Sequence, residues 1–294
     1  TVEPGIGQVV LTLGDGESMP LKRDTNRLIF GGTMLQVRNE RGTLVYSKIK
    51  SKEASEKIVY NTLTVPVRER FQLVLADGTK VFLNSGSEMR YPERFGKARR
   101  EVFLKGEAWF EVAKDSAREF WVHAGAMDVK VLGTSFNVKA YERLETVATT
   151  LVEGSVEVAC AGKSFQIVPG EQFVYDKNNR VMDVRMVDTE SYVSWKDGYY
   201  KFRQTTLEEI METLSVWYGL NVFYVNESAK QVEFTGKVRR YEDARMLLDK
   251  FEQTGDVVFD IKGNNVFITI KQKKPFAREW NSFLVKARGM VWQS

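Results

Sequence analysis

The chain has 294 residues, of which 43% are hydrophobic, and its 43 Lys and Arg against 39 Asp and Glu give a formal net charge of +4. This length favours more than one domain, and the hydrophobic content supports real cores, which excludes a disordered chain. Residues 272–294 carry five basic residues and one acid, so the charge excess lies in this tail and nucleic-acid binding is not indicated. The sequence has no apolar run of about 18 residues that would predict a membrane span, and its first residues, TVEPGIGQ, lack the charged-then-apolar order of a signal peptide.

The N-terminal part contains the first of two similar hairpins. Residues 11–21 read LTLGDGESMPL, and residues 73–83 read LVLADGTKVFL, with the leucines and the Asp-Gly pair at the same offsets. Alternating apolar residues around Asp-Gly predict a strand, a type I′ turn and a strand. Asp15, Gly16, Asp77 and Gly78 are therefore interpreted as turn residues, because duplicated hairpins are typical of architecture and not of a catalytic carboxylate. Residues 1–63 are expected to form a hairpin region that packs on the following body.

Residues 64–190 are predicted to form a body of successive strands. The units VFLKGEAWFEV (102–112), TLVEGSVEVA (150–159) and QIVPGEQFVYD (166–176) each contain an apolar pair, a glycine and alternating apolar residues. Gly106, Gly154 and Gly170 would supply the positive φ or close approach that a turn or bulge requires. Turn signals without a helical period predict a mainly β body, either a sandwich, a barrel or a short β-solenoid.

The pattern of apolar residues changes near residue 195. Residues 206–219 show helical spacing, with Thr206 and Glu209 as a capping box and Gly219 as the stop. Strands are predicted at 221–225, 231–238, 257–261 and 265–270, with a second helix in 241–255. The order βαβ followed by βαββ predicts a small α+β domain over residues 195–271.

The residues that usually carry catalysis are scarce. One cysteine, Cys160, and one histidine, His123, exclude a multi-histidine zinc site, and no nucleophile motif or P-loop is present. Glu107 and Glu111 would lie about 13 Å apart on one strand face, too far for a glycosidase pair, so both are expected on a solvated face. We therefore predict a protein that is not an enzyme, with no catalytic residue, no cofactor and no metal.

A carbohydrate-binding β-module is the alternative that the aromatic residues leave open. Trp109, Phe110, Trp121 and Tyr141 would serve if their rings were exposed in a cleft. Trp109 and Phe110 are neighbours, so on a strand they point to opposite faces.

An ordered series of motifs over residues 60–271 resembles one family. LVLADGTKVFLNSGSEMRYPERF, REVFLKGEAWFEV, VLGTSFNVKAY, VEGSVEV and PGEQ, followed by SWKDGYYKFRQTTLEEIMETLSVWYGLNV, are similar to the FecR-type anti-sigma regulators. The resemblance implies a sensor: a cytoplasmic segment that binds an extracytoplasmic-function sigma factor, one membrane helix, and a periplasmic region that receives a signal from a TonB-dependent outer-membrane receptor. This chain resembles the periplasmic region alone, without the sigma-binding segment or the membrane helix.

The predicted C-terminal domain also resembles the small βαβ signalling domains of those receptors and of secretins. Small α+β units leave strand edges that a partner extends by strand addition. The candidate edges contain Val232 and Phe234 on one strand and Val266 and Ile268 on another; burial inside the sheet is the equally weighted alternative. The tail 272–294 has the spacing of a basic amphipathic helix, which would pack on the body, or else contact a partner or a membrane surface.

Overall fold

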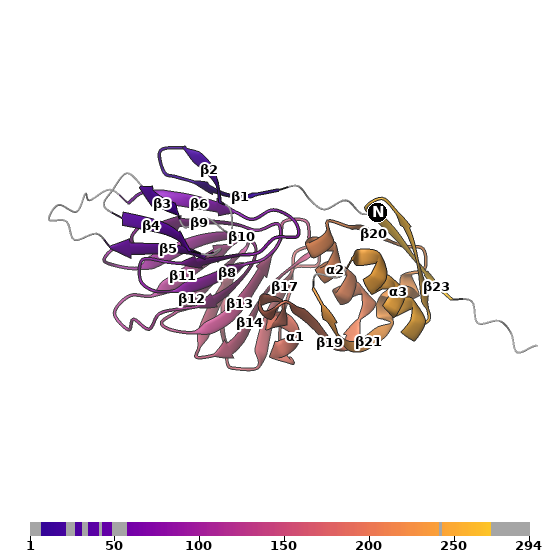
Figure 1. The fold of residues 1–294 in the computed structure, drawn as a ribbon. Helices are drawn as coiled ribbons and strands as arrows, with labels where there is room; N and C mark the ends of the chain where they lie inside the picture. The colour runs from indigo at the N-terminus through magenta and orange to yellow at the C-terminus, as the bar shows by residue number, and fades with distance from the viewer. Residues whose placement is uncertain are drawn as a thin grey trace, which may run out of the picture.

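The computed structural model describes residues 7–21, 27–30, 35–40, 43–48, 58–240 and 243–271. It shows a β-rich body beside a smaller region that combines helices and strands, with α1, β17 and β19 where the two meet (Figure 1). The predicted class, a mainly β body followed by a small α+β domain, is confirmed. The predictions for the tail 272–294 lie outside the described residues.

The described strands of the body run from β1 to β18. They are β1 Val9–Thr12, β2 Ser18–Leu21, β3 Arg27–Phe30, β4 Leu35–Glu40, β5 Thr43–Lys48, β6 Tyr60–Thr64, β7 Phe71–Val74, β8 Lys80–Leu83, β9 Glu88–Pro92, β10 Arg100–Glu111, β11 Phe120–Ala124, β12 Met127–Val131, β13 Ser135–Ala140, β14 Thr146–Glu153, β15 Val156–Cys160, β16 Lys163–Ile167, β17 Glu171–Asp176 and β18 Val181–Met186.

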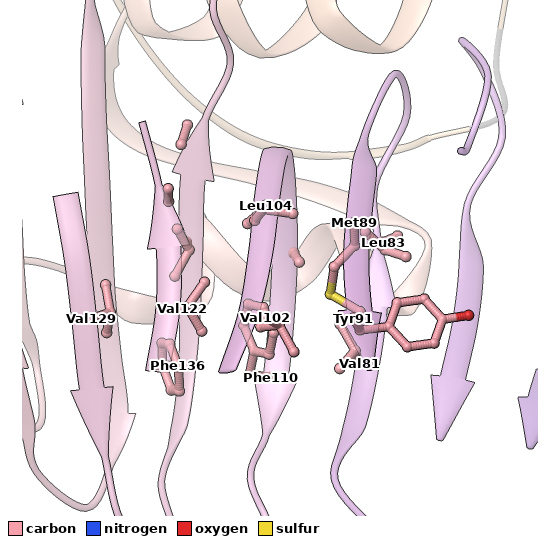
Figure 2. Packing of buried hydrophobic residues seen from close by; sticks show 14 of the residues in the cluster. Val81, Leu83, Met89, Tyr91, Val102, Leu104, Phe110, Val122, Val129 and Phe136 are labelled. Atoms are coloured by element: carbon pink, nitrogen blue, oxygen red, sulfur yellow. The ribbon is translucent and has the colours of Figure 1, made fainter. Parts of the chain in front are cut away.

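These strands form two layers. The first layer has the order β2-β1-β6-β9-β10-β11-β12-β15-β16. The second has the order β3-β4-β5-β7-β8-β10-β13-β14-β17-β18. Figure 2 shows the apolar side chains between them, with Val102 and Val122 from the first layer beside Phe110 and Phe136 from the second. The period-2 alternation of the strands places these side chains inside the body.

Both Asp-Gly pairs lie in turns, but the turn type differs from the prediction. Gly78 donates its amide to Leu75 O at 2.9 Å, and Leu75 donates its own to Thr79 O at 2.8 Å; Gly16 and Leu13 repeat this pattern. Only the glycines have positive φ, 89° at Gly78 and 91° at Gly16. The prediction of type I′ is therefore wrong, because that turn needs positive φ at both central residues. Each of these loops is longer than a two-residue type I′ loop, because the glycine with positive φ adds a bulge.

Three further glycines mark passages between the layers. Gly154 and Gly170, with φ of 97° and 94°, connect β14 to β15 and β16 to β17. Gly106 is no turn: it lies inside β10, where the strand leaves β9 and β11 in the first layer and joins β8 and β13 in the second. Its φ is 105°, and a Cβ there would lie 2.4 Å from Ser87 Oγ, so a larger residue would clash.

The C-terminal region follows the predicted order βαβ then βαββ. Its elements are α1 Thr189–Val193, a 3-10 turn Ser194–Asp197, β19 Tyr199–Thr206, α2 Leu207–Tyr218, β20 Asn221–Tyr224, a 3-10 turn Glu227–Gln231, β21 Glu233–Arg239, α3 Ala244–Thr254, β22 Val257–Lys262 and β23 Asn265–Ile270. β19 pairs with β21, and the other strands form a sheet of order β20-β23-β22. The Thr206 side chain accepts from Glu209 N at 3.3 Å at the start of α2, and Gly219 ends it with φ of 68°.

Candidate functional site at the junction of the body and the C-terminal domain

A fully buried arginine lies where the two regions meet. Arg240, directly after β21, donates from Nη1 to Trp195 O at 2.9 Å and from Nη2 to Asn84 Oδ1 at 2.5 Å. Its guanidinium carbon lies 3.5 Å from the centroid of the Trp217 ring. A buried cation is costly without such partners, and here a body residue supplies one of them. Arg240 therefore ties the C-terminal domain to the loop after β8.

Asn84 of the same loop also donates a hydrogen bond to a buried carboxylate on β10. Glu107 on β10 is 8% exposed and accepts from Asn84 Nδ2 at 2.7 Å and from Asn137 Nδ2 at 2.9 Å. Asn84 thus contacts both Arg240 and Glu107. The expectation that Glu107 lies on a solvated face is wrong, because the C-terminal domain covers the outer face of β10 here. Glu111 does reach solvent, and its carboxylate lies 3.5 Å from Lys80 Nζ.

Two neighbouring residues of β10 pack in the cores of different regions. Phe110 belongs to the core of the body, whereas Trp109 packs in the hydrophobic cluster of the C-terminal domain with Trp195 and Trp217. Trp195 also donates from Nε1 to Asn137 Oδ1 at 3.2 Å. The predicted opposite directions of Trp109 and Phe110 are confirmed, and the C-terminal cluster includes a side chain from the body.

The end of α2 is held by a second set of bonds from the body. Ser85 Oγ donates to Val216 O at 3.1 Å, and the Tyr141 hydroxyl donates to Ser85 O at 2.8 Å. Burial raises the pKa of the phenols of Tyr141 and Tyr200 above the ordinary value, so both stay neutral and available as donors. These contacts fix α2 against the body at its C-terminal end.

Beside these contacts lies a cleft of about 350 Å³ between the second layer of the body and the C-terminal domain. Its floor includes Thr150 and Gln172, which are 1% and 3% exposed. At its rim two ion pairs join body to α2: Lys139 Nζ lies 3.3 Å from Glu212 Oε2, and Arg185 Nη2 lies 3.3 Å from Glu209 Oε1. The Arg185–Glu209 pair is the more exposed of the two, and an exposed pair contributes little stability, so this side of the rim is closed weakly.

The comparisons with known proteins agree with this division into two regions. The sequence model for the FecR protein matches residues 61–157, from β6 to β15, and the model for the FecR C-terminal region matches residues 199–268, from β19 to β23. The chain belongs to the FecR-type anti-sigma factors. No curated protein matches it.

Two crystal structures of a candidate anti-sigma factor from Parabacteroides distasonis are similar to this FecR-type chain. Both are 28% identical in sequence to this chain, with a TM-score of 0.65. The first match covers 72% of this chain and 99% of the crystallised chain, and the second covers 73% of this chain and 100% of the crystallised chain. Arg240, Asn84 and Glu107 lie within the matched FecR ranges, whereas Gln172 and Arg185 of the cleft lie between them.

The predicted edge residues are mostly core residues in this FecR-type domain. β23 lies between β20 and β22, and its Val266 and Ile268 are fully buried, so the expectation that β23 offers an edge is wrong. Among the described strands β21 pairs with β19 alone, so it is an edge strand, although its Phe234 is 7% exposed and packs edge-on against Phe251. Val232 precedes β21, and its carbonyl accepts from Leu207 N at 2.7 Å, which anchors the start of α2.

The other candidate residues from the sequence make local contacts or lie in the core. His123 Nδ1 lies 2.7 Å from Asp128 Oδ1, and its ring stacks on Phe103. Cys160 is buried, which raises the pKa of its thiol. Of the four rings of the carbohydrate alternative, Trp109, Phe110 and Tyr141 are buried and only Trp121 is partly exposed. Stacking of sugars needs exposed ring faces, so this set forms no platform.

The described residues contain no group of three or more His, Cys, Asp or Glu side chains that would hold a metal ion. Nor does any helix within them have the length and apolar content needed to cross a membrane.

Proposed function

We propose that this chain is the periplasmic signal-receiving region of the anti-sigma regulator, and that it relays a signal from a TonB-dependent outer-membrane receptor to an extracytoplasmic-function sigma factor. The receptor's signalling domain binds the C-terminal domain, and a cytoplasmic segment of the regulator binds the sigma factor. Membership of the FecR family supports the regulatory role. The observation that carries the receptor contact is the edge strand β20.

β20 has the properties of a strand that accepts a partner. Among the described strands it pairs with β23 alone, and Phe223 and Val225 are 47% and 63% exposed. The Phe223 ring stacks on Phe267 of β23 with 5.1 Å between centroids, which extends the apolar surface. In strand addition, main-chain bonds supply affinity and alternate side chains supply specificity. An incoming strand at β20 would have both.

The opposite edge of the same sheet is less suited to pairing. On β22 the Phe259 amide donates to Glu252 Oε1 at 2.5 Å, so a side chain of α3 occupies a donor that an added strand would need. A charged group at an edge is a common device against unwanted pairing. We therefore place the receptor contact at β20 and not at β22.

The buried junction gives the body a part in the relay. Force or displacement applied at β20 acts on a domain whose α2 and β21 ends are bonded to the body through Ser85 and Asn84. Packed, hydrogen-bonded contacts transmit rigid-body shifts better than a flexible linker does. In this proposal the C-terminal domain receives the signal and the body moves with it.

The test compares matched variants of the whole chain by calorimetry against the purified signalling domain of a TonB-dependent receptor from the same organism. Phe223→Lys is expected to weaken binding about tenfold or more, since a charge would be desolvated at the contact. Val258→Lys, on β22 of the same sheet and 41% exposed, is the control and should bind like the wild type. Both variants should keep the wild-type melting temperature. Loss of affinity in Val258→Lys alone would place the contact on the other edge, and no binding by the unmodified chain would overturn the proposed receptor.

A further inference from the structure

The cleft beside the junction has features that the receptor contact does not use. Its floor comes from β13, β14 and β17 of the body, and its opposite wall comes from α1, β19 and α2. A volume of about 350 Å³ lies in the range of small-molecule sites, which occur often between domains. We propose that this cleft binds a small, neutral, hydroxyl-rich solute of the size of a mono- or disaccharide, and that the solute bridges the body and α2.

The charges around the cleft exclude an anion. Its three basic side chains each have an acidic partner: Arg185 has Glu209, Lys139 has Glu212, and Lys201 lies 3.3 Å from Asp188. A phosphate or carboxylate ligand would have to break one of these pairs. Five acidic residues line the cleft, so the local field also opposes negative charge. They are Glu107, Asp176, Glu208, Glu209 and Glu212.

The acidic residues are engaged as well, so a cationic ligand would have to displace partners that these carboxylates already have. Glu107 accepts from two asparagine amides, and Asp176 accepts from the Asn178 and Asn179 amides at 2.8 and 3.0 Å. Glu208 lies 3.4 Å from Lys230 Nζ. A ligand that interacts by hydrogen bonds and ring contacts, without net charge, therefore suits this lining.

The floor of the cleft offers both hydrogen-bond donors and hydrogen-bond acceptors. Thr150 Oγ1 accepts from Gln172 Nε2 at 2.9 Å, and Gln172 Oε1 accepts from Arg185 Nη2 at 3.2 Å. The Thr150 hydroxyl keeps its own proton, and the Gln172 amide keeps a second N–H. The Ser191 hydroxyl on α1, also in the lining, has no hydrogen-bond partner among the described residues. Such donors and acceptors match vicinal hydroxyl groups.

Aromatic side chains complete the lining. Tyr192, Trp195 and Tyr200 line the cleft on the side of the C-terminal domain. Trp195 and Tyr200 are each 3% exposed and offer little ring surface, so of these three the half-buried Tyr192 is the ring that can lie against an apolar face of the ligand. The site is separate from β20, so solute binding would be an input that does not depend on the proposed receptor contact.

The experiment measures thermal unfolding and calorimetric binding of the whole chain with millimolar glucose, N-acetylglucosamine, maltose and trehalose. Sodium phosphate and citrate at matched ionic strength are the anionic arm. At least one neutral sugar is expected to raise the melting temperature in a saturable way, because a ligand of the folded state stabilises it by mass action. No saturable effect from any sugar, or a larger effect from the anions, would overturn the proposal.

Cleft-filling variants locate the binding. Thr146→Trp, from a half-buried position on β14 in the lining, should lower the affinity for the active sugar about tenfold or more. Thr269→Trp, on the exposed side of β23 and outside the lining, is the matched control and should bind as the wild type does. If Thr146→Trp fails to fold, Thr213→Trp on the α2 wall makes the same test. Wild-type affinity in the folded cleft variant, or equal loss in the control, would show that the cleft is not the site.

Discussion

The body and the C-terminal domain complete their cores in different ways. The buried apolar cluster of the body comes entirely from its own strands and the loops between them, from Val9 to Tyr175. The cluster of the C-terminal domain spans Trp195 to Ile268 but also includes Trp109 from β10. A domain of about 75 residues buries a smaller fraction of its surface than a larger one, so contact with the body supplies what its own strands lack. The comparison shows that the junction belongs to the fold of the smaller domain.

Each region also contains a fully buried arginine with a different set of partners. Arg100 in the body donates to Asp77 Oδ2 at 2.9 Å and to the carbonyls of Ala113 and Arg118 at 2.8 and 2.9 Å. The partners of Arg240 include an amide oxygen, a carbonyl and the Trp217 ring. Asp77, first identified as a turn residue, therefore also neutralises a charge inside the body.

The largest effect is expected from Arg100→Met. Removing this guanidinium leaves the Asp77 carboxylate buried without its counter-ion, which costs about 3–5 kcal/mol of the free energy of unfolding of the body. Arg240→Met should act mainly on the junction and lower the amide protection of α2 and β21. Urea denaturation gives the free energies, and hydrogen exchange read by mass spectrometry gives their location. Equal loss of protection throughout the body in both variants would contradict the distinction between the two arginines.

A pair of neighbouring substitutions sharpens the same comparison. Trp109→Ala should cost about 3 kcal/mol and increase exchange in the C-terminal domain, because the lost ring belongs to that cluster. Phe110→Ala is the matched control, since its ring packs in the body, and the increased exchange should move to β8 and β13. The domain division at residues 190–195 stays a prediction, and these variants test it. Identical exchange patterns would show that the two regions unfold as one unit.

The smallest effect concerns alkaline pH. Burial raises the pKa of Tyr46 in the body to about 12 and also raises that of its neighbour Tyr91, whose hydroxyl lies 2.9 Å away. A folded-state pKa above the unfolded value near 10 means that this stability is fully present below about pH 10 and is lost as the pH rises toward 12. We expect a late phase of phenolate absorbance that coincides with unfolding. Tyr46→Phe should reduce its amplitude, and complete titration of all tyrosines near pH 10 in the folded protein would contradict the burial.

Local sequence features predicted the elements of this protein well. The order of strands and helices in the C-terminal domain, the cap at Thr206 and the stop at Gly219 depend on neighbours within a few residues, so spacing and turn chemistry reveal them. The Asp-Gly turns were located by the same reasoning, although their type was not. A special backbone position was predicted at Gly106, but whether that glycine reverses the strand or carries it into another layer depends on the strands that pair with each half of β10, and these are separate segments of the chain.

The candidate site was hidden for a similar reason. Glu107 was expected to be solvated because a strand with one apolar face implies a wet opposite face, yet a second domain covers that face. A tryptophan at position 109 beside this glutamate was the signal available, since a large ring on the outer face of a strand indicates a contact. The cleft had no comparable signal, because its lining comes from separate strands and helices of both regions.

By itself the sequence determined the β-rich body, the α+β domain and the family, because each follows from local periodicity or from an ordered series of motifs. Tertiary structure alone decided that β23 is central and β20 an edge, since strand order depends on which segments meet after the chain has folded. It also decided that Arg240, Asn84 and Glu107 come together from positions far apart in the chain. Burial of those polar groups is stable only when all of their partners arrive together, and no local pattern records that requirement.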